Sequence, residues 1–258
     1  MIALVTGASS GIGAATARRL AREPGARLVL VARRRERLDA LAREVGAATV
    51  LAVDLLDEDA PARIAAAVEA EHGRLDLLVN NAGAAWRGRF GDAGWEDVRR
   101  HMALNFDAPV RLTEALLPLL RRSAPSAIVN VASVAARISR ANSGAYSASK
   151  FALAAWSDAL HLEERERGVH VGLVLPGFVA TEGFPQRELL DKRLTRRLVS
   201  TPEAVAEAIV DAGPGGRAER YVPRAWAVTA GLRVLAPRLV RRTTSGGGAM
   251  TPTTAADA

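Results

Sequence analysis

The sequence predicts an α/β fold in which a doubly wound parallel sheet forms a single domain. Short apolar segments alternate with longer segments rich in Ala, Leu, Arg and Glu, as expected for strands alternating with helices. The expected strands are almost entirely apolar, which is typical of a parallel sheet with helices on both faces. The 258 residues are 49% hydrophobic, which is enough for one large buried core.

The order of the elements favours a Rossmann-type sheet. Strands are expected at residues 2–5, 28–32, 50–53, 75–80, 127–131 and 169–175. The folded domain is expected to cover residues 1–223. A basic and apolar extension over residues 224–242 should pack on that domain or at an interface. Residues 243–258 lack periodicity and are expected to be disordered.

A glycine-rich segment, Thr6–Gly13, joins the first strand to an alanine-rich helical segment. Gly7, Gly11 and Gly13 would let the backbone turn sharply and approach a pyrophosphate, which the amides and dipole of the helix N-terminus attract. A preceding strand, a following helix and a second strand about 20 residues later complete the context of a dinucleotide-binding loop.

Two other interpretations of these glycines are weaker. Residues 7–11 also fit the Gly-x-Ser-x-Gly nucleophile elbow of hydrolases. Only six residues precede Gly7, so we expect no room upstream for the oxyanion loop and earlier strands of a hydrolase. A Walker A loop is excluded because no Lys-Ser or Lys-Thr pair follows the glycines.

Tyr146 and Lys150 form a candidate acid–base pair, because a helix places residues four positions apart on the same face. A free tyrosine titrates near pH 10. One ammonium held about 4 Å from the phenolic oxygen, at an effective dielectric of about 20, favours the phenolate by roughly 4 kcal/mol. Lys150 is also one of only two lysines, with Lys192, among basic residues that are otherwise arginine. A chance pair on a helix surface is the alternative.

The end of the second strand indicates which dinucleotide binds. Folds that bind NAD place an acid there for the ribose hydroxyls, but here Ala32 is followed by Arg33, Arg34 and Arg35. We therefore expect Arg33 to recognise the 2′-phosphate of NADP(H), and NAD(H) is the less favoured cofactor. Arg35, and to a lesser degree Arg34, are alternatively solvated residues at a helix start.

These motifs, taken in order, resemble the short-chain dehydrogenase/reductase family of the single-domain type, over about residues 2 to 223. Thr6–Gly13 is similar to the TGxxxGxG cofactor loop of the family, and Tyr146–Lys150 to its YxxxK motif. Asp54 matches the acid that contacts adenine, and residues 80–83 match the segment that closes the fourth strand. Pro176-Gly177, followed by Thr181, matches the turn at the nicotinamide end.

The resemblance implies two groups of site residues and no metal site. The catalytic residues would be Asn105, Ser133, Tyr146 and Lys150. The cofactor-binding residues would be Gly7, Ser9, Ser10, Gly11, Ile12, Gly13, Arg33, Asp54, Leu55, Asn81, Ala82, Gly83, Tyr146, Lys150, Pro176, Gly177, Val179 and Thr181.

The implied activity is hydride transfer between a nicotinamide and a carbonyl or secondary alcohol. Tyr146 would be the general acid/base, and Lys150 would lower its pKa and reach the nicotinamide ribose. Ser133 would hold the carbonyl oxygen, and Asn105 would fix a water that links Lys150 to solvent. The substrate would be a small molecule, and the family suggests a homodimer or homotetramer. The alternative is an NADP(H)-binding sensor or scaffold without turnover, which would not need all four side chains.

Metal and thiol chemistry find little support in the sequence. Cysteine is absent, which excludes disulfides and thiolate metal sites. Asp57, Glu58 and Asp59 precede Pro61 at a helix start, so we expect them to cap amides rather than bind a metal. The four histidines lack metal-ligand spacing and are expected at the surface or in packing: His72, His101, His161 and His170.

Other charged and apolar groups are expected to be structural. Glu163, Glu164 and Glu166 alternate with arginines, which is typical of a solvated helix face. Residues 178–200 correspond to the variable substrate lid of the family, in which Phe178, Phe184 and Leu189 would form an apolar wall. The lid also holds five basic residues that are either solvated or face an acidic substrate: Arg187, Lys192, Arg193, Arg196 and Arg197.

Most of the excess charge lies near the C-terminus. The whole chain has a net charge of +7, and residues 217–242 carry seven arginines against Glu219 alone, a net of +6. Residues 226–240 are apolar but contain Arg233 and Arg238, so they are not expected to span a membrane. They would pack in the core or at a subunit interface, or lie on an anionic membrane surface. No nucleic-acid-binding motif accompanies the charge.

The chain begins directly with an apolar strand and lacks the charged and long apolar regions of a signal peptide. We therefore expect a cytoplasmic location. Peripheral attachment to a membrane through the basic C-terminal segment is the alternative.

Overall fold

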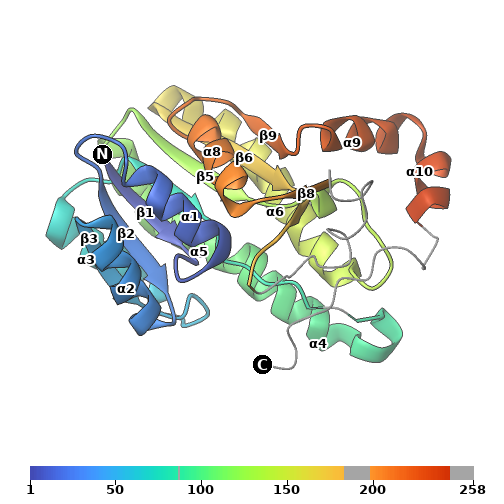
Figure 1. Ribbon diagram of the computed structural model, residues 1–258, viewed down its shortest axis with the longest axis horizontal. Coiled ribbons are helices and arrows are strands. Elements are labelled where there is room, and N and C mark those ends of the chain that lie inside the picture. The colour runs from blue at the N-terminus through green and yellow to red at the C-terminus, as the bar shows by residue number, and fades with distance from the viewer. Residues whose placement is uncertain (87, 183–197, 245–258) are drawn as a thin grey trace.

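The predicted doubly wound parallel sheet is confirmed by the computed structural model, which describes residues 1–86, 88–182 and 198–244. The main sheet has seven parallel strands in the order β3-β2-β1-β4-β5-β6-β9 (Figure 1). Its strands are β1 (Ile2–Thr6), β2 (Arg27–Ala32), β3 (Ala48–Ala52), β4 (Leu77–Asn80), β5 (Ser126–Val131), β6 (Val169–Pro176) and β9 (Glu219–Val222). A separate pair joins β7 (Phe178–Val179) to β8 (Val199–Ser200).

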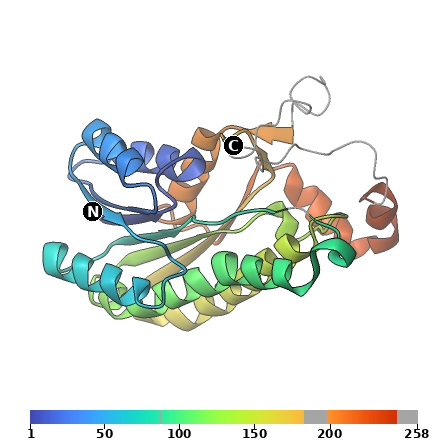
Figure 2. The ribbon, with the colours of Figure 1, turned by 90° about the horizontal axis from the view of Figure 1, so that it is seen from below.

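Helices cover both faces of the sheet (Figure 2). One face carries α1 (Gly11–Leu20), α2 (Arg35–Val45) and α8 (Pro202–Ala212). The other carries α3 (Ala60–His72), α5 (Ala108–Arg122) and α6 (Gly144–Glu164). Before α5 comes α4 (Phe90–Met102), which packs beside α6. The remaining helical turns are η1 (Ala103–Asp107), η2 (Val134–Ala136) and η3 (Arg165–Arg167).

The first strand shows why these strands are apolar throughout. Side chains alternate between the two faces of a strand, and both faces of β1 are covered. Ala3 and Val5 join the core beneath α1 and α8, while Ile2 and Leu4 join the core beneath α3 and α5. A polar residue on either face would be buried.

The six expected strands begin and end within two residues of the observed ones. The sequence analysis did not predict β9, an edge strand whose Glu219 is exposed and whose Arg220 and Tyr221 are half-buried. An edge strand of this kind lacks the apolar run that marks the central strands. The short β7–β8 pair was also not predicted.

The strand order determines where a ligand site is expected. The chain runs outward from β1 through β2 to β3, then returns so that β4 pairs with β1 on its other side. Ligands of doubly wound sheets bind at this switch point, beyond the carboxyl ends of the strands. The loops after β1 and β4 therefore lie next to each other.

Two expectations for acidic residues were wrong. Asp59 occupies the N-cap position of α3, but its side chain caps no backbone amide and instead lies 3.5 Å from Arg63. Glu164 is only 3% exposed rather than part of a solvated face. Its carboxylate accepts two hydrogen bonds from Arg121, at 2.8 Å and 2.5 Å, and this pairing lowers the pKa of Glu164.

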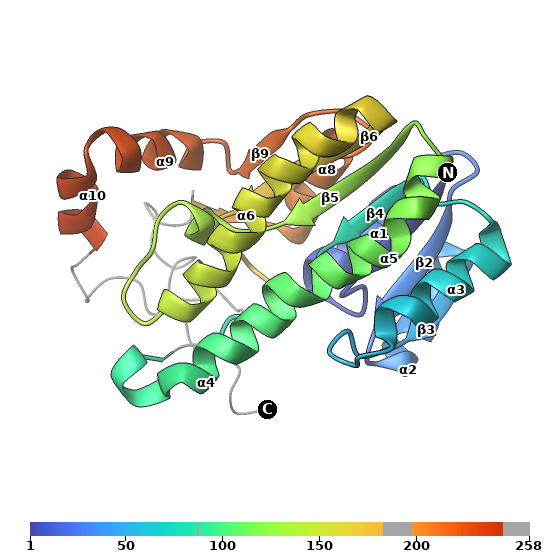
Figure 3. The same cartoon turned by 180° about the vertical axis from the view of Figure 1, so that it is seen from behind.

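The basic extension forms two helices, α9 (Trp226–Leu235) and α10 (Pro237–Thr244), which project from one end of the sheet (Figures 1 and 3). Because α10 ends at Thr244, the expected disorder does not begin at residue 243. Residues 245–258 lie outside the described residues, as do seven named residues of the expected lid: Phe184, Arg187, Leu189, Lys192, Arg193, Arg196 and Arg197. No helix in the described ranges is long and apolar enough to cross a membrane.

We expect Arg121→Leu to lower the free energy of unfolding by about 2 to 3 kcal/mol at pH 7, because it leaves the Glu164 carboxylate buried and unpaired. The matched control is Arg18→Leu, which removes an equally bidentate but exposed pair with Glu44 and should cost less than about 1 kcal/mol. Urea denaturation of both variants measures the two costs.

The cost of Arg121→Leu should also depend on pH. Arg121 depresses the pKa of Glu164 in the folded state, so the pair stabilises the fold above the pKa of an unfolded glutamate. That stabilisation is lost as the pH falls through the folded pKa. Equal costs for Arg121→Leu and Arg18→Leu at pH 7 would contradict a structural role for the buried pair.

Candidate active site

The glycine-rich loop after β1 turns tightly and packs directly against neighbouring backbone. Gly7 has φ +66° and Gly11 has φ +54°, in the left-handed region that favours glycine. A Cβ on Gly13 would lie 2.2 Å from the carbonyl oxygen of Gly7, so only glycine fits there. Ser10, at the N-cap of α1, makes no side-chain capping bond. The first amides of α1 are therefore not capped by Ser10 and can receive an anion.

Thr6 connects this loop to the end of β4. Its hydroxyl oxygen accepts hydrogen bonds from the backbone amides of Asn81 (2.9 Å) and Ala82 (3.0 Å), and the hydroxyl donates to the Val79 carbonyl (3.2 Å). The Asn81 side-chain amide donates back to the Thr6 carbonyl at 2.8 Å. These bonds fix the loops after β1 and β4 against each other. The sequence analysis named Asn81 and Ala82 but assigned no such role to Thr6.

Arg33 and Arg34, at the end of β2, contact different partners. The exposed Arg33 lies 3.8 Å from the carboxylate of Asp54, beyond β3. Arg34 donates hydrogen bonds to the hydroxyls of Ser9 (3.0 Å) and Ser10 (2.8 Å) in the glycine-rich loop. Arg34 is thus exposed at the start of α2 and is also held by the glycine-rich loop. Its partners are about 25 positions away in the chain, so no local pattern reveals them.

These residues fit a nicotinamide dinucleotide. A side chain at position 13 would clash with the backbone of Gly7, so the start of α1 packs closely on the loop. Three arginines, Arg33 to Arg35, and no acid follow β2, where the ribose of a dinucleotide is recognised. Asp54 accepts a hydrogen bond from the amide of Leu56, which orders the turn after β3, while the Leu55 side chain is buried.

The four predicted catalytic residues come together at the carboxyl ends of β4 and β5 and the start of α6. Gly83 shows their proximity: a Cβ on it would lie 2.8 Å from Oδ1 of Asn105 and 3.4 Å from Nζ of Lys150. Ser133 follows β5, and Tyr146 lies in the first turn of α6, one turn before Lys150. The Ser133 hydroxyl accepts from the Ala135 amide (3.1 Å) and donates to the Pro176 carbonyl (3.3 Å).

Asn105 lies in the π-helical turn η1 between α4 and α5, a feature often found at functional sites. It is fully buried. Its Oδ1 accepts from the Ala84 amide, and its Nδ2 donates to the Ala84 carbonyl and to the Ser149 hydroxyl, each at 3.0 Å. Asn105 thus joins the segment after β4 to the helix that carries Tyr146 and Lys150.

The electrostatics of Tyr146 differ from the expectation. Burial raises the pKa of its hydroxyl, and the opposing groups are the Ser133 hydroxyl and the Arg140 guanidinium rather than Lys150. The Lys150 ammonium donates instead to the Val131 carbonyl at 2.9 Å. It is only 4% exposed, and burial lowers its pKa to about 8.

Two further residues lie beside Tyr146. The sequence analysis did not name Arg140, and it assigned His101 to the surface or to packing. Arg140 stacks over the ring of Phe178, with its guanidinium carbon 4.8 Å from the ring centroid, and its positive charge favours the Tyr146 phenolate. The buried His101 packs edge-on to Tyr146, at 6.1 Å between ring centroids. Its Nε2 accepts a hydrogen bond from the Trp86 amide. His101 therefore has the packing role that was predicted.

The predicted nicotinamide end follows β6. Pro176 is buried, and the Gly177 amide donates to the Val222 carbonyl at 2.8 Å. A Cβ on Gly177 would lie 2.2 Å from Nε1 of Trp226, so α9 packs directly on this turn. Thr181 lies against the glycine loop, since a Cβ on Gly11 would be 3.2 Å from its methyl group. The Val179 side chain is buried.

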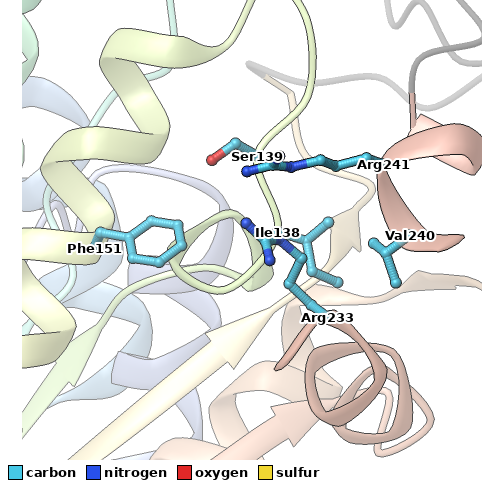
Figure 4. A pocket seen from close by; sticks show the side chains of 6 residues that line it. All are labelled: Ile138, Ser139, Phe151, Arg233, Val240 and Arg241. Atoms are coloured by element: carbon cyan, nitrogen blue, oxygen red, sulfur yellow. The ribbon is translucent and has the colours of Figure 1, made fainter. Parts of the chain in front are cut away.

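A pocket of about 290 Å³ is lined by residues of the segment before α6, of α6 itself, and of α9 and α10 (Figure 4). Its apolar walls are Ile138, Phe151 and Val240, and Ser139 adds a hydroxyl. Arg233 from α9 and Arg241 from α10 also line it. This pocket separates α10 from the start of α6. Across the described part of the chain, no group of three or more acidic or histidine side chains is arranged to hold a metal ion.

Comparison with known proteins places the chain among dehydrogenases. A family model described as short chain dehydrogenase matches residues 1–189. The Bacillus subtilis protein named uncharacterized oxidoreductase YxnA is 35% identical over 254 residues, which cover 93% of this chain and 70% of that protein. A crystal structure of a short-chain dehydrogenase from Streptomyces avermitilis has a TM-score of 0.79 and 31% identity, over 94% of this chain and 95% of that one.

A mammalian relative is also similar. The Bos taurus protein named dehydrogenase/reductase SDR family member 7B is 35% identical over 190 residues. The match covers 70% of this chain and 58% of the bovine protein, so the chain spans less than two thirds of that relative.

We expect Lys150→Met to raise the free energy of unfolding by about 1 to 2 kcal/mol at pH 7. Burial lowers the pKa of Lys150 from 10.5 to about 8, which corresponds to a cost of roughly 3 kcal/mol for the charged form. Loss of the hydrogen bond to Val131 offsets part of the gain. Urea denaturation of wild type and variant measures the difference.

The gain should disappear at high pH. The folded pKa is the lower one, so the unfolded state binds more protons between pH 8 and 10.5, and the wild type gains stability over this range. The advantage of Lys150→Met is therefore complete below pH 8 and is lost as the pH approaches 10.5. A difference that is constant from pH 7 to pH 10 would contradict the buried charge.

Proposed function

This chain belongs to the short-chain dehydrogenase family of oxidoreductases, and we propose that it is an NADP(H)-dependent enzyme that interconverts a carbonyl compound and a secondary or primary alcohol. The observation that supports this best is that Asn105 and Lys150 lie beside Gly83, at the switch point of the sheet, while the Ser133 hydroxyl interacts with the hydroxyl of Tyr146. The substrate is a small molecule, as the family implies.

The proposed cofactor site uses the residues at the ends of β1, β2 and β4. The amides at the start of α1 would receive the pyrophosphate, and Arg33 and Arg34 would pair with the 2′-phosphate. Asp54 and the turn after β3 would border the adenine, while Gly83 and Gly177 would border the nicotinamide. When bound, NADP(H) supplies or accepts the hydride.

The proposed acid–base chemistry centres on Tyr146. In the reducing direction its hydroxyl donates a proton to the carbonyl oxygen as negative charge develops there, while the Ser133 hydroxyl donates a hydrogen bond to the same oxygen. A phenol with a raised pKa holds its proton tightly, so nearby positive charge must favour the phenolate. Arg140 supplies such charge in this structure, and we propose that Lys150, which has a pKa of about 8 and is mostly protonated at pH 7, adds to it.

We propose that Asn105 positions Lys150. Its amide holds Ala84 and Ser149, and so fixes Lys150 relative to the loop after β4. We also propose that it orders a water through which Lys150 reaches solvent. By relation to the family, we propose a homodimer or homotetramer in the cytoplasm.

Tyr146→Phe should reduce NADPH-dependent turnover by at least about a hundredfold, because it removes the proton but keeps the ring. Affinity for NADPH should remain within a few fold of wild type. Tyr221→Phe is the matched control, since Tyr221 is the only other tyrosine and lies on the edge strand β9. NADPH oxidation is followed with aldehydes, aliphatic and aromatic ketones, quinones and ketoacyl thioesters.

The outcome also separates an enzyme from a sensor. Substrate-dependent oxidation by wild type and Tyr221→Phe, but not by Tyr146→Phe, supports the proposal. Turnover by Tyr146→Phe at the wild-type rate would exclude Tyr146 as the acid. NADPH binding without turnover of any substrate would favour the alternative, a sensor or scaffold that binds NADP(H).

Arg33→Ser combined with Arg34→Ser should weaken NADPH binding by about tenfold to a hundredfold, because charge-assisted hydrogen bonds to a phosphate are lost. NADH, which has no 2′-phosphate, should bind nearly as before. Arg35→Ser is the control, since Arg35 is equally exposed in the first turn of α2. Fluorescence titration gives the affinities. If the double variant binds NADPH as tightly as wild type, the preference for NADP(H) does not come from these arginines.

A further inference from the structure

Large apolar side chains are concentrated on the outer surface of α9 and α10. Among the described residues ten large hydrophobic side chains are exposed, and half of them lie here. They are Val228, Leu232, Val234, Leu235 and Leu239. Val234 and Leu235 are 78% and 83% exposed, more than any of the other eight. We call these five residues, with the neighbouring Arg224, Arg238 and Arg242, the α9–α10 outer face.

Three of the five apolar residues share one side of α9. Val228, Leu232 and Leu235 are spaced four and three residues apart, so they form one stripe along α9. The opposite side attaches the helices to the domain. Ala230 is buried there, and Val240 of α10 packs against Val134 and Ile138. The helices are thus apolar on the attached side and on the outer side as well.

The charge beside this face has one sign. From Arg220 to Thr254 and beyond, no acidic residue occurs until Asp257. Arg224, Arg238 and Arg242 are exposed, and none of them forms an ion pair with a described residue. An exposed apolar stripe bordered by arginines is the pattern of a helix that lies in the interface of an anionic membrane.

We propose that the α9–α10 outer face docks this protein onto anionic lipid bilayers. Leu232, Leu235 and their neighbours would enter the boundary between headgroups and acyl chains, and the arginines would pair with lipid phosphates. Each arginine near an anionic surface strengthens binding by about fivefold. The helices lie in the interface and do not cross it, which agrees with their length.

Charge argues against a second copy of this chain as the occupant. A two-fold interface brings the same surface patch of both copies together, so the arginines of one copy would lie in a patch that contains the arginines of the other. Acidic side chains are absent from this segment, so nothing in it would compensate. An anionic bilayer supplies both the apolar layer and the negative charge.

Docking would place the bilayer near the candidate active site. Trp226, the first residue of α9, packs on Gly177, and Val240 packs on the segment that follows Ser133. The inference does not rest on the proposed hydride transfer, because vesicle binding is measured without substrate or cofactor.

The test is co-sedimentation of the full chain with vesicles. One set contains phosphatidylcholine alone, and the other contains phosphatidylcholine and phosphatidylglycerol in equal parts. We expect binding to the anionic vesicles, at least tenfold weaker binding to the neutral ones, and weakening of the former by salt. Val228→Ser combined with Leu235→Ser should reduce binding to anionic vesicles by about tenfold or more, and so should Arg238→Ser combined with Arg242→Ser.

The matched control is Leu56→Ser combined with Leu162→Ser, which removes two exposed leucines elsewhere on the surface and should leave binding unchanged. Circular dichroism checks that each variant is folded, and light scattering gives its mass. The proposal is overturned if wild type ignores anionic vesicles, or if the outer-face variants bind them like the control. It is also overturned if Val228→Ser with Leu235→Ser lowers the mass of an oligomer that does not bind vesicles, because a second copy would then be the occupant.

Discussion

The hydrogen bonds that Thr6 makes to Asn81 and Ala82 hold together the two loops on which the candidate site depends. Parallel pairing of β1 with β4 brings the loops to one edge of the sheet, and Thr6 then fixes their separation. On one side the start of α1 packs on the loop after β1, where Gly13 lies directly against the backbone of Gly7. On the other side Gly83 lies against Asn105 and Lys150. The positions of both halves of the site therefore depend on the hydrogen bonds of Thr6.

Buried ionisable groups in the candidate site lower the stability of the folded protein. Lys150 is buried with a carbonyl as its hydrogen-bond partner and no carboxylate, and its pKa falls to about 8. Burial raises the pKa of the neighbouring Tyr146 at the same time. Strongly perturbed groups of this kind cluster at functional sites, where stability is given up for reactivity. Glu164 shows the opposite case, because its buried carboxylate is fully paired with Arg121.

Arginine serves different purposes in different parts of this chain. At the glycine loop, Arg34 is held by two serine hydroxyls and is available to an anion. Beside Tyr146, Arg140 stacks on Phe178 and its positive charge favours the Tyr146 phenolate. On α9 and α10 the arginines border an exposed apolar stripe. The guanidinium suits all three because it remains charged when partly buried and binds planar groups and phosphates.

The strands of the central sheet, the glycine loop and the Tyr146–Lys150 spacing could all be predicted from the sequence. Each depends on residues that are neighbours in the chain: an apolar run, a turn that needs glycine, or one turn of helix. The folded structure alone shows that Arg34 binds the loop serines, that the buried Glu164 pairs with Arg121 and that Arg140 lies near Tyr146. It also decided which side of α9 is exposed. These contacts join residues that are distant in the chain or depend on how a helix is rotated against its neighbours, and local periodicity carries no information about either.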